Sequence, residues 1–360
     1  MSLSNINAEP TTKTPEVSWS SLDWAVLDRL RECFLARSAT GADYWRTPAD
    51  IANYDFTYGE RIGWKWDAVL RELRLRGWFP PPHSVLLDWG CGSGVAGRRI
   101  LDFFGAHQFA ALQLFDRSTL AMEFATAAAR RRYPELSIEC AGRGVPTSGR
   151  GTVLVASHVL NELDEAATRS LRQALDGADA VLWVEPGTHA DSRALIAMRD
   201  SLMDQFVVVA PCTHQAPCGL QAAVNERHWC HQFATPPAGV MGDGDWVRFA
   251  QRAGIDLRSA PYSFLVLERR GLREPIPGRL PEGWARFLGG SRVYKGYARV
   301  LGCRADGVRE WMLQKRDAPS LFKAVKSGRA GPLHRWTAAG NHIVDAESMD
   351  EMKGDRPGPE

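Results

Sequence analysis

An acidic residue followed by three closely spaced glycines could hold a nucleoside ligand. Asp88 ends the apolar run Val85–Leu87, and Gly90, Gly92 and Gly94 follow it at alternate positions. Glycine allows positive φ and close approach of the backbone to a ligand, and the free N–H groups of a helix N-terminus point into such a site. The pattern therefore predicts a strand, a tight turn and a helix start that together bind a ligand.

A second acidic residue, Asp116, ends the next predicted strand, Phe109–Phe115, where its carboxylate could accept hydrogen bonds from a ribose diol. The dinucleotide fingerprint places its acid about 20 residues after the glycines and spaces its third glycine differently. The form DxGxGxG instead resembles motif I of class I S-adenosylmethionine-dependent methyltransferases. A dinucleotide fold, and a turn that serves only to pack a helix on a strand, are the alternatives.

Polar residues gather again in the segment ASHVLNEL, after the fourth predicted strand. In many methyltransferases this loop lies beside the transferable methyl group, so the candidate catalytic residues are Ser157, His158, Asn161 and Glu162. The alternative is that His158 and Asn161 only cap the following helix. The tetrad Asn/Asp-Pro-Pro-Tyr/Phe is absent here. Its absence argues against methylation of an exocyclic amino group of a base.

Three cysteines, Cys212, Cys218 and Cys230, lie within 19 residues, and Cys303 lies far downstream. Thiolates are the strongest soft-metal ligands of a protein, and four of them suit zinc or an iron–sulfur cluster. Paired spacings typical of zinc sites are missing, which favours a [4Fe-4S] cluster. Buried structural cysteines are a further alternative. Three nearby histidines keep a mixed zinc site open: His214, His228 and His231.

Strands and helices alternate around these residues, which predicts an α/β, doubly wound, Rossmann-like sheet with right-handed crossovers. Ligands of such sheets bind at the carboxyl ends of the strands, where Asp88, Asp116, Ser157 and Glu185 fall. Two helices are predicted before the sheet, over 19–37 and 64–76. The predicted strands are 85–88, 109–115, 136–140, 153–157, 180–185 and 262–267.

Several segments together resemble the mitochondrial-type family of small ribosomal subunit methyltransferases and assembly factors, which also has bacterial members. They are APCTHQAPC, WCHQF, ASHVLNEL, YSFLVLERR and SRVYKGYARVLGCRADGVREWMLQKRDAPSLFKAVKSG, and the similarity runs from Pro80 to Gly328. The resemblance implies a class I methyltransferase that associates with the small ribosomal subunit or its rRNA. It also implies a [4Fe-4S] cluster on Cys212, Cys218, Cys230 and Cys303, and S-adenosylmethionine contacts at Asp88, Gly90, Gly92 and Asp116. Gly94 in the glycine turn and Ser157 at its strand end are further candidate contacts of the cofactor.

Charge is unevenly distributed along the chain. The net charge is +2, yet residues 268–329 contain 15 Lys/Arg against 6 Asp/Glu. This region is a candidate surface for a polyanion, with a solvated basic face as the alternative. No apolar stretch is long enough to span a membrane and the N-terminus does not resemble a signal peptide, so we expect a cytoplasmic protein whose cysteines are thiols.

We expect five regions along the chain. A disordered tail covers 1–18 and a helical region 19–80, and the methyltransferase domain covers 81–271 with a metal-cluster insertion at 207–235. A basic extension follows over 272–330, with a hairpin around Asp306-Gly307, a strong turn signal, and a helix over 320–326. Residues 331–360 are expected to be a flexible tail.

These features favour an S-adenosylmethionine-dependent methyltransferase that acts on rRNA or serves as a ribosome assembly factor, with a structural [4Fe-4S] cluster. A biosynthetic methyltransferase with a small-molecule substrate is the alternative, since 13 tryptophans could build an aromatic pocket. A protein that binds the cofactor without turnover is a third possibility.

Overall fold

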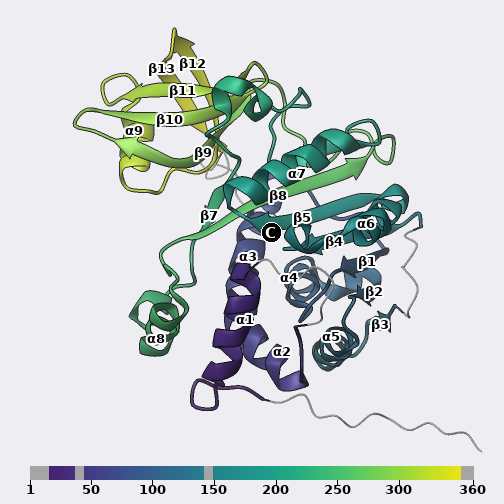
Figure 1. Cartoon of the computed structure of the whole chain (residues 1–360). Helices are drawn as coiled ribbons and strands as arrows, with labels where there is room; N and C mark the ends of the chain where they lie inside the picture. The colour runs from purple at the N-terminus through teal and green to yellow at the C-terminus, as the bar shows by residue number, and fades with distance from the viewer. Residues whose placement is uncertain (1–15, 37–43, 142–148, 350–360) are drawn as a thin grey trace, which may run out of the picture.

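The computed structural model describes residues 16–36, 44–141 and 149–349 (Figure 1). N-terminal helices pack against a central sheet that has helices on both faces, and a barrel follows near the C-terminal end. Most of the predicted N-terminal tail (1–15) and the last part of the predicted C-terminal tail (350–360) lie outside the described residues.

The central sheet has eight strands among the described residues, in the order β3-β2-β1-β4-β5-β8-β6, with β7 paired to β8. Strands β1 to β5 pair in parallel, whereas β8 is antiparallel to both β5 and β6. The predicted α/β, Rossmann-like class is confirmed. The bounds are β1 Ser84–Trp89, β2 Phe109–Phe115, β3 Ser137–Cys140, β4 Thr152–Ser157, β5 Ala180–Pro186, β6 Phe206–Ala210, β7 Gln232–Ala234 and β8 Ala260–Arg269.

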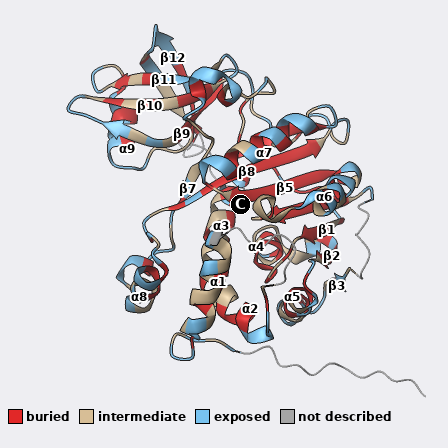
Figure 2. Ribbon diagram, viewed as in Figure 1, coloured by how far each residue is buried: buried red, intermediate tan, exposed pale blue. Residues whose placement is uncertain are grey.

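The two faces of the sheet bury separate apolar cores, because successive side chains of a strand point to opposite sides. Helices α3, α4 and α5 pack on the face that carries Leu86 and Leu112. Helices α6 and α7 pack on the face that carries Leu87 and Trp183. Figure 2 shows the middle of the sheet, β5 and β8, buried along most of its length. The helix bounds are α3 Glu60–Arg76, α4 Val95–Phe104, α5 Thr119–Arg132, α6 Glu165–Gly177 and α7 His189–Leu202.

The N-terminal helices α1 (Trp24–Ala36) and α2 (Pro48–Tyr54) pack on α5 through an apolar cluster. Helix α2 starts where the Thr47 side chain accepts a hydrogen bond from the N–H of Asp50, with Pro48 in its first turn. A π-helical segment, Asp55–Gly59, joins α2 to α3. This arrangement brings aromatic side chains from the N-terminal region to the carboxyl ends of β1 and β2.

The insertion with three of the cysteines starts later than the sequence indicates. Residues 207–210 of the predicted insertion 207–235 belong to β6, whose five residues are all buried. A short, continuously apolar run such as FVVVA suits a strand covered on both faces. The insertion therefore begins at Pro211, and it contains the short 3-10 helices η4 (Gly219–Gln221) and η5 (Ala223–Asn225) before β7. Helix α8 (Gly244–Ala253) leads from the insertion back to β8.

The C-terminal part folds as a closed barrel rather than as a lone hairpin with a flexible tail. Five strands in the described part of the chain close in the order β10-β11-β13-β12-β9 around a separate apolar core. The predicted hairpin forms from β10 and β11, but Arg304 pairs with Gly307, so its two-residue loop is Ala305-Asp306. The bounds are β9 Trp284–Val293, β10 Tyr297–Arg304, β11 Gly307–Gln314, α9 Pro319–Lys326, β12 Leu333–Ala339 and β13 His342–Ser348.

Two strands thus occupy residues expected to be a flexible tail. Trp336 of β12 and Ile343 of β13 are buried in the barrel core, at 5% and 0% exposure. Burial of such side chains stabilises the strands by roughly 2 kcal/mol each. The acidic residues that suggested flexibility, Asp345 and Glu347, follow a register shift in the β12–β13 pairing, and there Asp345 is exposed and Glu347 is half-buried.

A buried group of charges joins the barrel to the sheet. Glu72 of α3 accepts a hydrogen bond from Nε of Arg76 at 2.9 Å and forms an ion pair with Arg286 of β9. Arg76 and Arg286 each also donate to the carbonyl oxygen of Pro211, at 2.8 Å. All three charged residues are less than 9% exposed. One cluster therefore ties together α3, the start of the insertion and the barrel.

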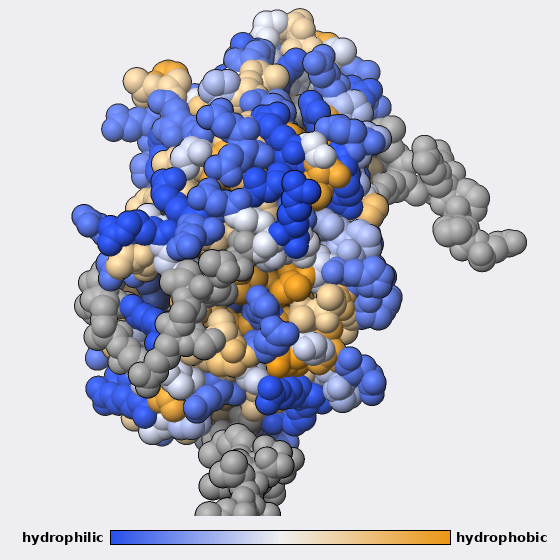
Figure 3. All heavy atoms as spheres, turned by 90° about the vertical axis from the view of Figure 1, so that its right-hand side faces the viewer, coloured by the Kyte–Doolittle hydropathy of each residue, from blue (hydrophilic) through white to orange (hydrophobic). Residues whose placement is uncertain are grey.

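Within the described residues, no helix has both the length and the apolar composition needed to cross a membrane. Figure 3 shows one face of the molecule, on which hydrophobic residues gather at mid-height and hydrophilic residues cover most of the remainder.

Candidate active site

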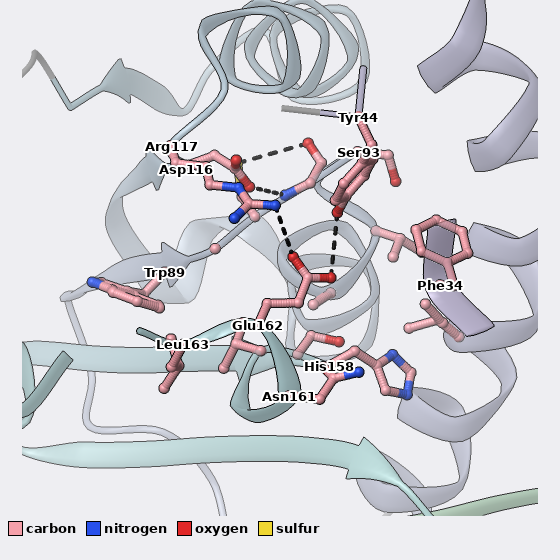
Figure 4. A pocket seen from close by; sticks show the side chains of 18 of the residues that line it. Phe34, Tyr44, Trp89, Ser93, Asp116, Arg117, His158, Asn161, Glu162 and Leu163 are labelled. Carbon is pink, nitrogen blue, oxygen red and sulfur yellow. Dashed lines mark hydrogen bonds and ion pairs between the residues drawn. The ribbon is translucent and has the colours of Figure 1, made fainter. Parts of the chain in front are cut away.

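A cavity of about 690 Å³ lies where β1, β2 and β4 end, beneath the N-terminal helices. In Figure 4, Glu162 points toward Tyr44 and Arg117, while His158 and Asn161 lie on its other side. Most of the predicted site residues therefore meet in one place. The wall includes Phe34, Tyr44, Tyr54, Lys65, Trp89, Gly90, Gly92, Ser93, Asp116, Ser157, His158, Asn161 and Glu162.

The glycine turn forms one wall of this cavity. Gly90, Gly92 and Gly94 all have positive φ, at 73°, 51° and 77°, and Gly90 and Gly92 line the cavity whereas Gly94 does not. Asp116 orients the turn, since its Oδ2 accepts the Gly92 N–H at 2.8 Å and its Oδ1 accepts the Ser118 N–H at 2.9 Å. The Asp116 carboxylate is thereby fixed at the cavity wall.

Asp88 does not line the cavity, although its spacing suggested a cofactor contact. It is fully buried, and its Oδ2 accepts the Gly97 N–H at 3.0 Å from the first turn of α4. Burial raises the pKa of Asp88 to about 7, partly offset by this hydrogen bond. Its side chain lies beneath the turn and supports the start of the helix.

The two cavity glycines differ in what surrounds them, which allows a matched test. A Cβ at Gly90 would lie 2.7 Å from Cγ1 of Val159, whereas a Cβ at Gly92 would meet nothing within 4 Å. Both substitutions force alanine to a positive φ, at about 1 kcal/mol, and Gly90→Ala adds about 2 kcal/mol of overpacking. We expect urea unfolding to show losses of about 3 kcal/mol for Gly90→Ala and about 1 kcal/mol for Gly92→Ala. Equal losses would contradict this account.

The loop after β4 forms the opposite wall, and Glu185 of β5 holds it in place. Oε1 of Glu185 accepts the backbone N–H groups of Val159 and Leu160, both at 3.1 Å, and Nε1 of Trp183 at 2.7 Å. His158 has a positive φ of 57°, which is uncommon for a residue other than glycine. The buried carboxylate thus stabilises a loop that turns sharply and presents its polar side chains to the cavity.

Lys65 of α3 is a site residue that sequence reasoning missed. Its Nζ lies 3.1 Å from Nε2 of His158. Burial, together with the charge of the nearby Arg61, lowers the pKa of Lys65 to about 7. Burial and the Lys65 charge lower the pKa of His158 well below its usual value. At neutral pH the pair therefore contains a neutral imidazole beside an amine that is about half protonated.

Glu162 belongs to a second polar group at the edge of the cavity. It forms an ion pair with Arg117 at 3.3 Å and accepts a long hydrogen bond of 3.5 Å from the Tyr44 hydroxyl. Burial raises the pKa of Glu162 to about 7, although Arg117 opposes this shift. Ser157 accepts a hydrogen bond from Nε1 of Trp66 at 3.0 Å, which links β4 to α3. The four predicted catalytic residues all line the cavity.

The four candidate metal ligands come together away from this cavity, between the insertion and the barrel. Cys218 and Cys230 pack against an apolar cluster that contains Cys303 of β10. Burial, together with the charges of Cys212 and Cys218, raises the pKa of Cys230 to about 12. Burial and the other three cysteines likewise raise the pKa of Cys303. Because the other thiols contribute to the raised pKa values of both Cys230 and Cys303, these sulfur atoms lie near one another.

The family model described as "Mitochondrial small ribosomal subunit Rsm22" matches residues 69–335, which include the glycine turn, the insertion and most of the barrel. The chain belongs to the Rsm22 family. This match confirms the family resemblance predicted from the quoted segments. No curated protein sequence matches the chain.

Solved structures resemble this Rsm22 family chain at low identity. Magnesium protoporphyrin IX methyltransferase from Synechocystis, with bound S-adenosylmethionine, is 12% identical with a TM-score of 0.37, over 69% of this chain and 99% of that one. The N-methyltransferase NodS from Bradyrhizobium japonicum, in complex with S-adenosylhomocysteine, is 13% identical with a TM-score of 0.36, over 67% and 98%.

The thiols of this Rsm22 family member are not arranged around a single metal position. Over residues 16–36, 44–141 and 149–349, no group of three or more His, Cys, Asp or Glu side chains could hold a metal ion. Three histidines were candidate ligands of a mixed zinc site. One of them, His214, lies near the thiols, with its Nε2 3.6 Å from Sγ of Cys303. His231 stacks on Trp229, and His228 accepts a hydrogen bond from Arg227. All seven cysteines are free thiols.

Proposed function

We propose that this Rsm22 family protein binds S-adenosylmethionine in the cavity and transfers its methyl group to RNA of the small ribosomal subunit. The observation that carries the proposal is a set of cavity-lining polar atoms that are buried without a hydrogen-bond partner among the described residues. Native proteins rarely leave such atoms unpaired. A polar ligand would satisfy them. The atoms are Nε of Arg61, Nε1 of Trp89, Oγ of Ser93, Nδ1 of His158, Oδ1 of Asn161 and Oγ of Ser170.

The cavity wall suits the parts of this cofactor. Asp116 would accept hydrogen bonds from the ribose hydroxyls, and Gly90 and Gly92 allow the backbone to approach the ligand closely. Trp89 and Phe115, with ring centroids 5.6 Å apart, offer apolar surface for the adenine. When bound, S-adenosylmethionine supplies a methyl group on a sulfonium, which chiefly needs a well-positioned acceptor. Asp88 and Gly94 would act indirectly, by supporting the turn.

The opposite wall carries the groups that would handle the acceptor. We propose that Ser157, Asn161 and Glu162 orient it by hydrogen bonds, since they line the cavity on the side of the β4 loop. The Lys65–His158 pair would remove its proton, because the neutral amine of Lys65 can take a proton that reaches Nε2 of His158.

The low pKa of Lys65 predicts the pH profile of methyl transfer. Lys65 is protonated below its pKa of about 7 and neutral above it, so the rate should rise with pH through about 7 and then level off. Lys65→Met should slow the single-turnover rate about 100-fold and remove this rise. Lys323→Met, at an exposed position of α9, should leave both unchanged. A Lys65→Met variant that kept the wild-type profile would rule out the proposed role.

We also propose that Cys212, Cys218, Cys230 and Cys303 hold a structural [4Fe-4S] cluster. Three of these thiols, from two segments, meet at an apolar junction, and Cys212 lies in the same insertion. Thiolates are the usual ligands of such clusters, which supports this choice. Protein purified anaerobically should contain iron and acid-labile sulfide in equal amounts, and Cys303→Ser should lose both. Zinc without iron would overturn the proposal.

Transfer from radiolabelled S-adenosylmethionine to small-subunit precursors would test the function directly. We expect label in RNA extracted from the precursor, and none with free small molecules as acceptors. Label in a small molecule alone would indicate a biosynthetic methyltransferase. Cofactor binding by isothermal titration without any transfer would indicate an assembly factor that holds S-adenosylmethionine as a structural ligand.

A further inference from the structure

The barrel has the topology of an OB-fold. With β9 to β13 numbered as strands 1 to 5, they close in the order 1-2-3-5-4. Strands 3 and 5 are parallel, and helix α9 lies between strands 3 and 4. OB-folds bind oligonucleotides on the face of strands 2 and 3 and at the loops between strands 1 and 2 and strands 4 and 5. In this chain that face is β10–β11, and the first loop is 294–296.

A groove of about 490 Å³ opens on this face, between the barrel and residues 224–228 of the insertion. Four of its lining residues are arginines, against one carboxylate, that of Glu310. We call it the arginine groove. Asn225 fixes the insertion side, because its Nδ2 donates to the carbonyl oxygens of Gly219 and Val308 at 2.9 and 3.0 Å. The arginines are Arg227, Arg292, Arg299 and Arg309.

Two of these cations are held side by side. Arg292 of β9 pairs in register with Arg299 of β10, and Glu310 of β11 forms ion pairs with both. Their side chains remain 61% and 42% exposed. Like charges on neighbouring strands repel one another, so Glu310 keeps them together on an open surface. Adjacent exposed guanidinium groups suit the phosphates of a nucleic acid strand.

The loop between β9 and β10 adds an aromatic surface next to these arginines. The rings of Tyr294 and Tyr297 stack, with centroids 4.7 Å apart and planes at 10°. Tyr294 is 41% exposed, and Lys295 between the two tyrosines is exposed as well. Proteins that bind single strands combine a cationic groove with aromatic side chains on which unpaired bases stack. Both parts are present on the OB-fold face.

We propose that the arginine groove and the Tyr294–Tyr297 pair form a binding site for single-stranded RNA. The arginines contact phosphates, and Tyr294 stacks on an unpaired base. The inference deepens the proposed function and rests on it for the choice of RNA over DNA. An acidic protein segment would use the cations but not the stacked rings, so the combination favours a nucleic acid strand.

Fluorescence anisotropy with a labelled 12-nucleotide RNA of mixed sequence tests the site. Arg292→Gln/Arg299→Gln should weaken binding about tenfold and reduce the slope of log affinity against log salt by about 1.4, for two lost phosphate contacts. Tyr294→Ala should weaken binding about tenfold with little change in slope. Glu310→Gln should bind more tightly, because it releases both arginines.

Matched control variants separate the contribution of the arginine groove to RNA binding from the contribution of the overall surface charge. Arg169→Gln/Arg248→Gln removes two arginines from α6 and α8 that are 72% and 64% exposed and also have carboxylate partners, and it should bind RNA as the wild type does. Glu165→Gln should likewise bind RNA as the wild type does, without the increase in affinity that is expected of Glu310→Gln. Equal weakening by both arginine pairs, equal affinity for duplex RNA, or equal competition by poly-glutamate would each overturn the proposal. The affinity for S-adenosylmethionine, measured in the same variants, should not change. A wild-type protein that did not bind S-adenosylmethionine would contradict the proposed function, but it would not contradict the RNA-binding site in the arginine groove.

Discussion

Asp116→Asn is expected to weaken the binding of S-adenosylmethionine and of S-adenosylhomocysteine about 100-fold. Hydrogen bonds to a charged carboxylate contribute roughly 1.5 kcal/mol each, so two to a ribose diol amount to about 3 kcal/mol. The substitution also replaces one of the two carboxylate oxygens by an amide N–H₂, so that the hydrogen bond from the N–H of either Gly92 or Ser118 is lost. Isothermal titration with both ligands measures the loss directly.

The comparison needs a variant that changes charge but not the site. Asp306→Asn removes an exposed carboxylate of the barrel that interacts with Arg309, and it should bind both ligands as the wild type does. Thermal melting of Asp116→Asn without ligand shows whether the variant is folded. A folded Asp116→Asn with wild-type affinity would contradict the position proposed for the cofactor ribose.

Glu72→Gln is expected to lower the free energy of unfolding by about 4 kcal/mol. Removing one member of a buried ionic group leaves the remaining charges uncompensated, which typically costs about 3 to 5 kcal/mol. Here both Arg76 and Arg286 lose their shared carboxylate, and both are less than 9% exposed. Urea unfolding followed by tryptophan fluorescence measures the change.

Glu165→Gln on α6 is the matched control for this loss. Glu165 forms an i,i+4 pair with Arg169, as Glu72 does with Arg76, but its side chain is 96% exposed. The cost of losing such a surface pair is about 0.5 kcal/mol or less. Similar losses in the two variants would mean that the Glu72 cluster contributes no more than a surface ion pair.

The sequence was sufficient to predict one wall of the cavity and six strands of the described sheet, but not β6 and β7. Buried parallel strands are continuous apolar runs that end in polar residues, so Asp116 and Ser157 could be located without a structure. The direction in which a side chain points could not be predicted in the same way. The spacing of Asp88 is that of a cofactor ligand, yet its carboxylate turns toward the N–H of Gly97 beneath the turn.

The role of Lys65 and the fold of the barrel could not be predicted from the sequence, for different reasons. Lys65 stands in a helix between two buried tryptophans, and only the packing of α3 on the sheet brings it to His158, 93 residues away. Strands β9 and β10 are rich in Gly and Arg, and the last strand, β13, contains two acidic residues. Such composition is typical of loops, and only closure of the barrel gives these strands a shared core.

Helix α3 carries both Lys65, beside the proposed acceptor, and Glu72, which binds Arg286 of the barrel. Seven residues separate them, which corresponds to two helical turns or about 10 Å. The helix is continuous over Glu60–Arg76. The packing that holds the barrel against the sheet and the packing that places Lys65 beside His158 therefore depend on the same rigid element.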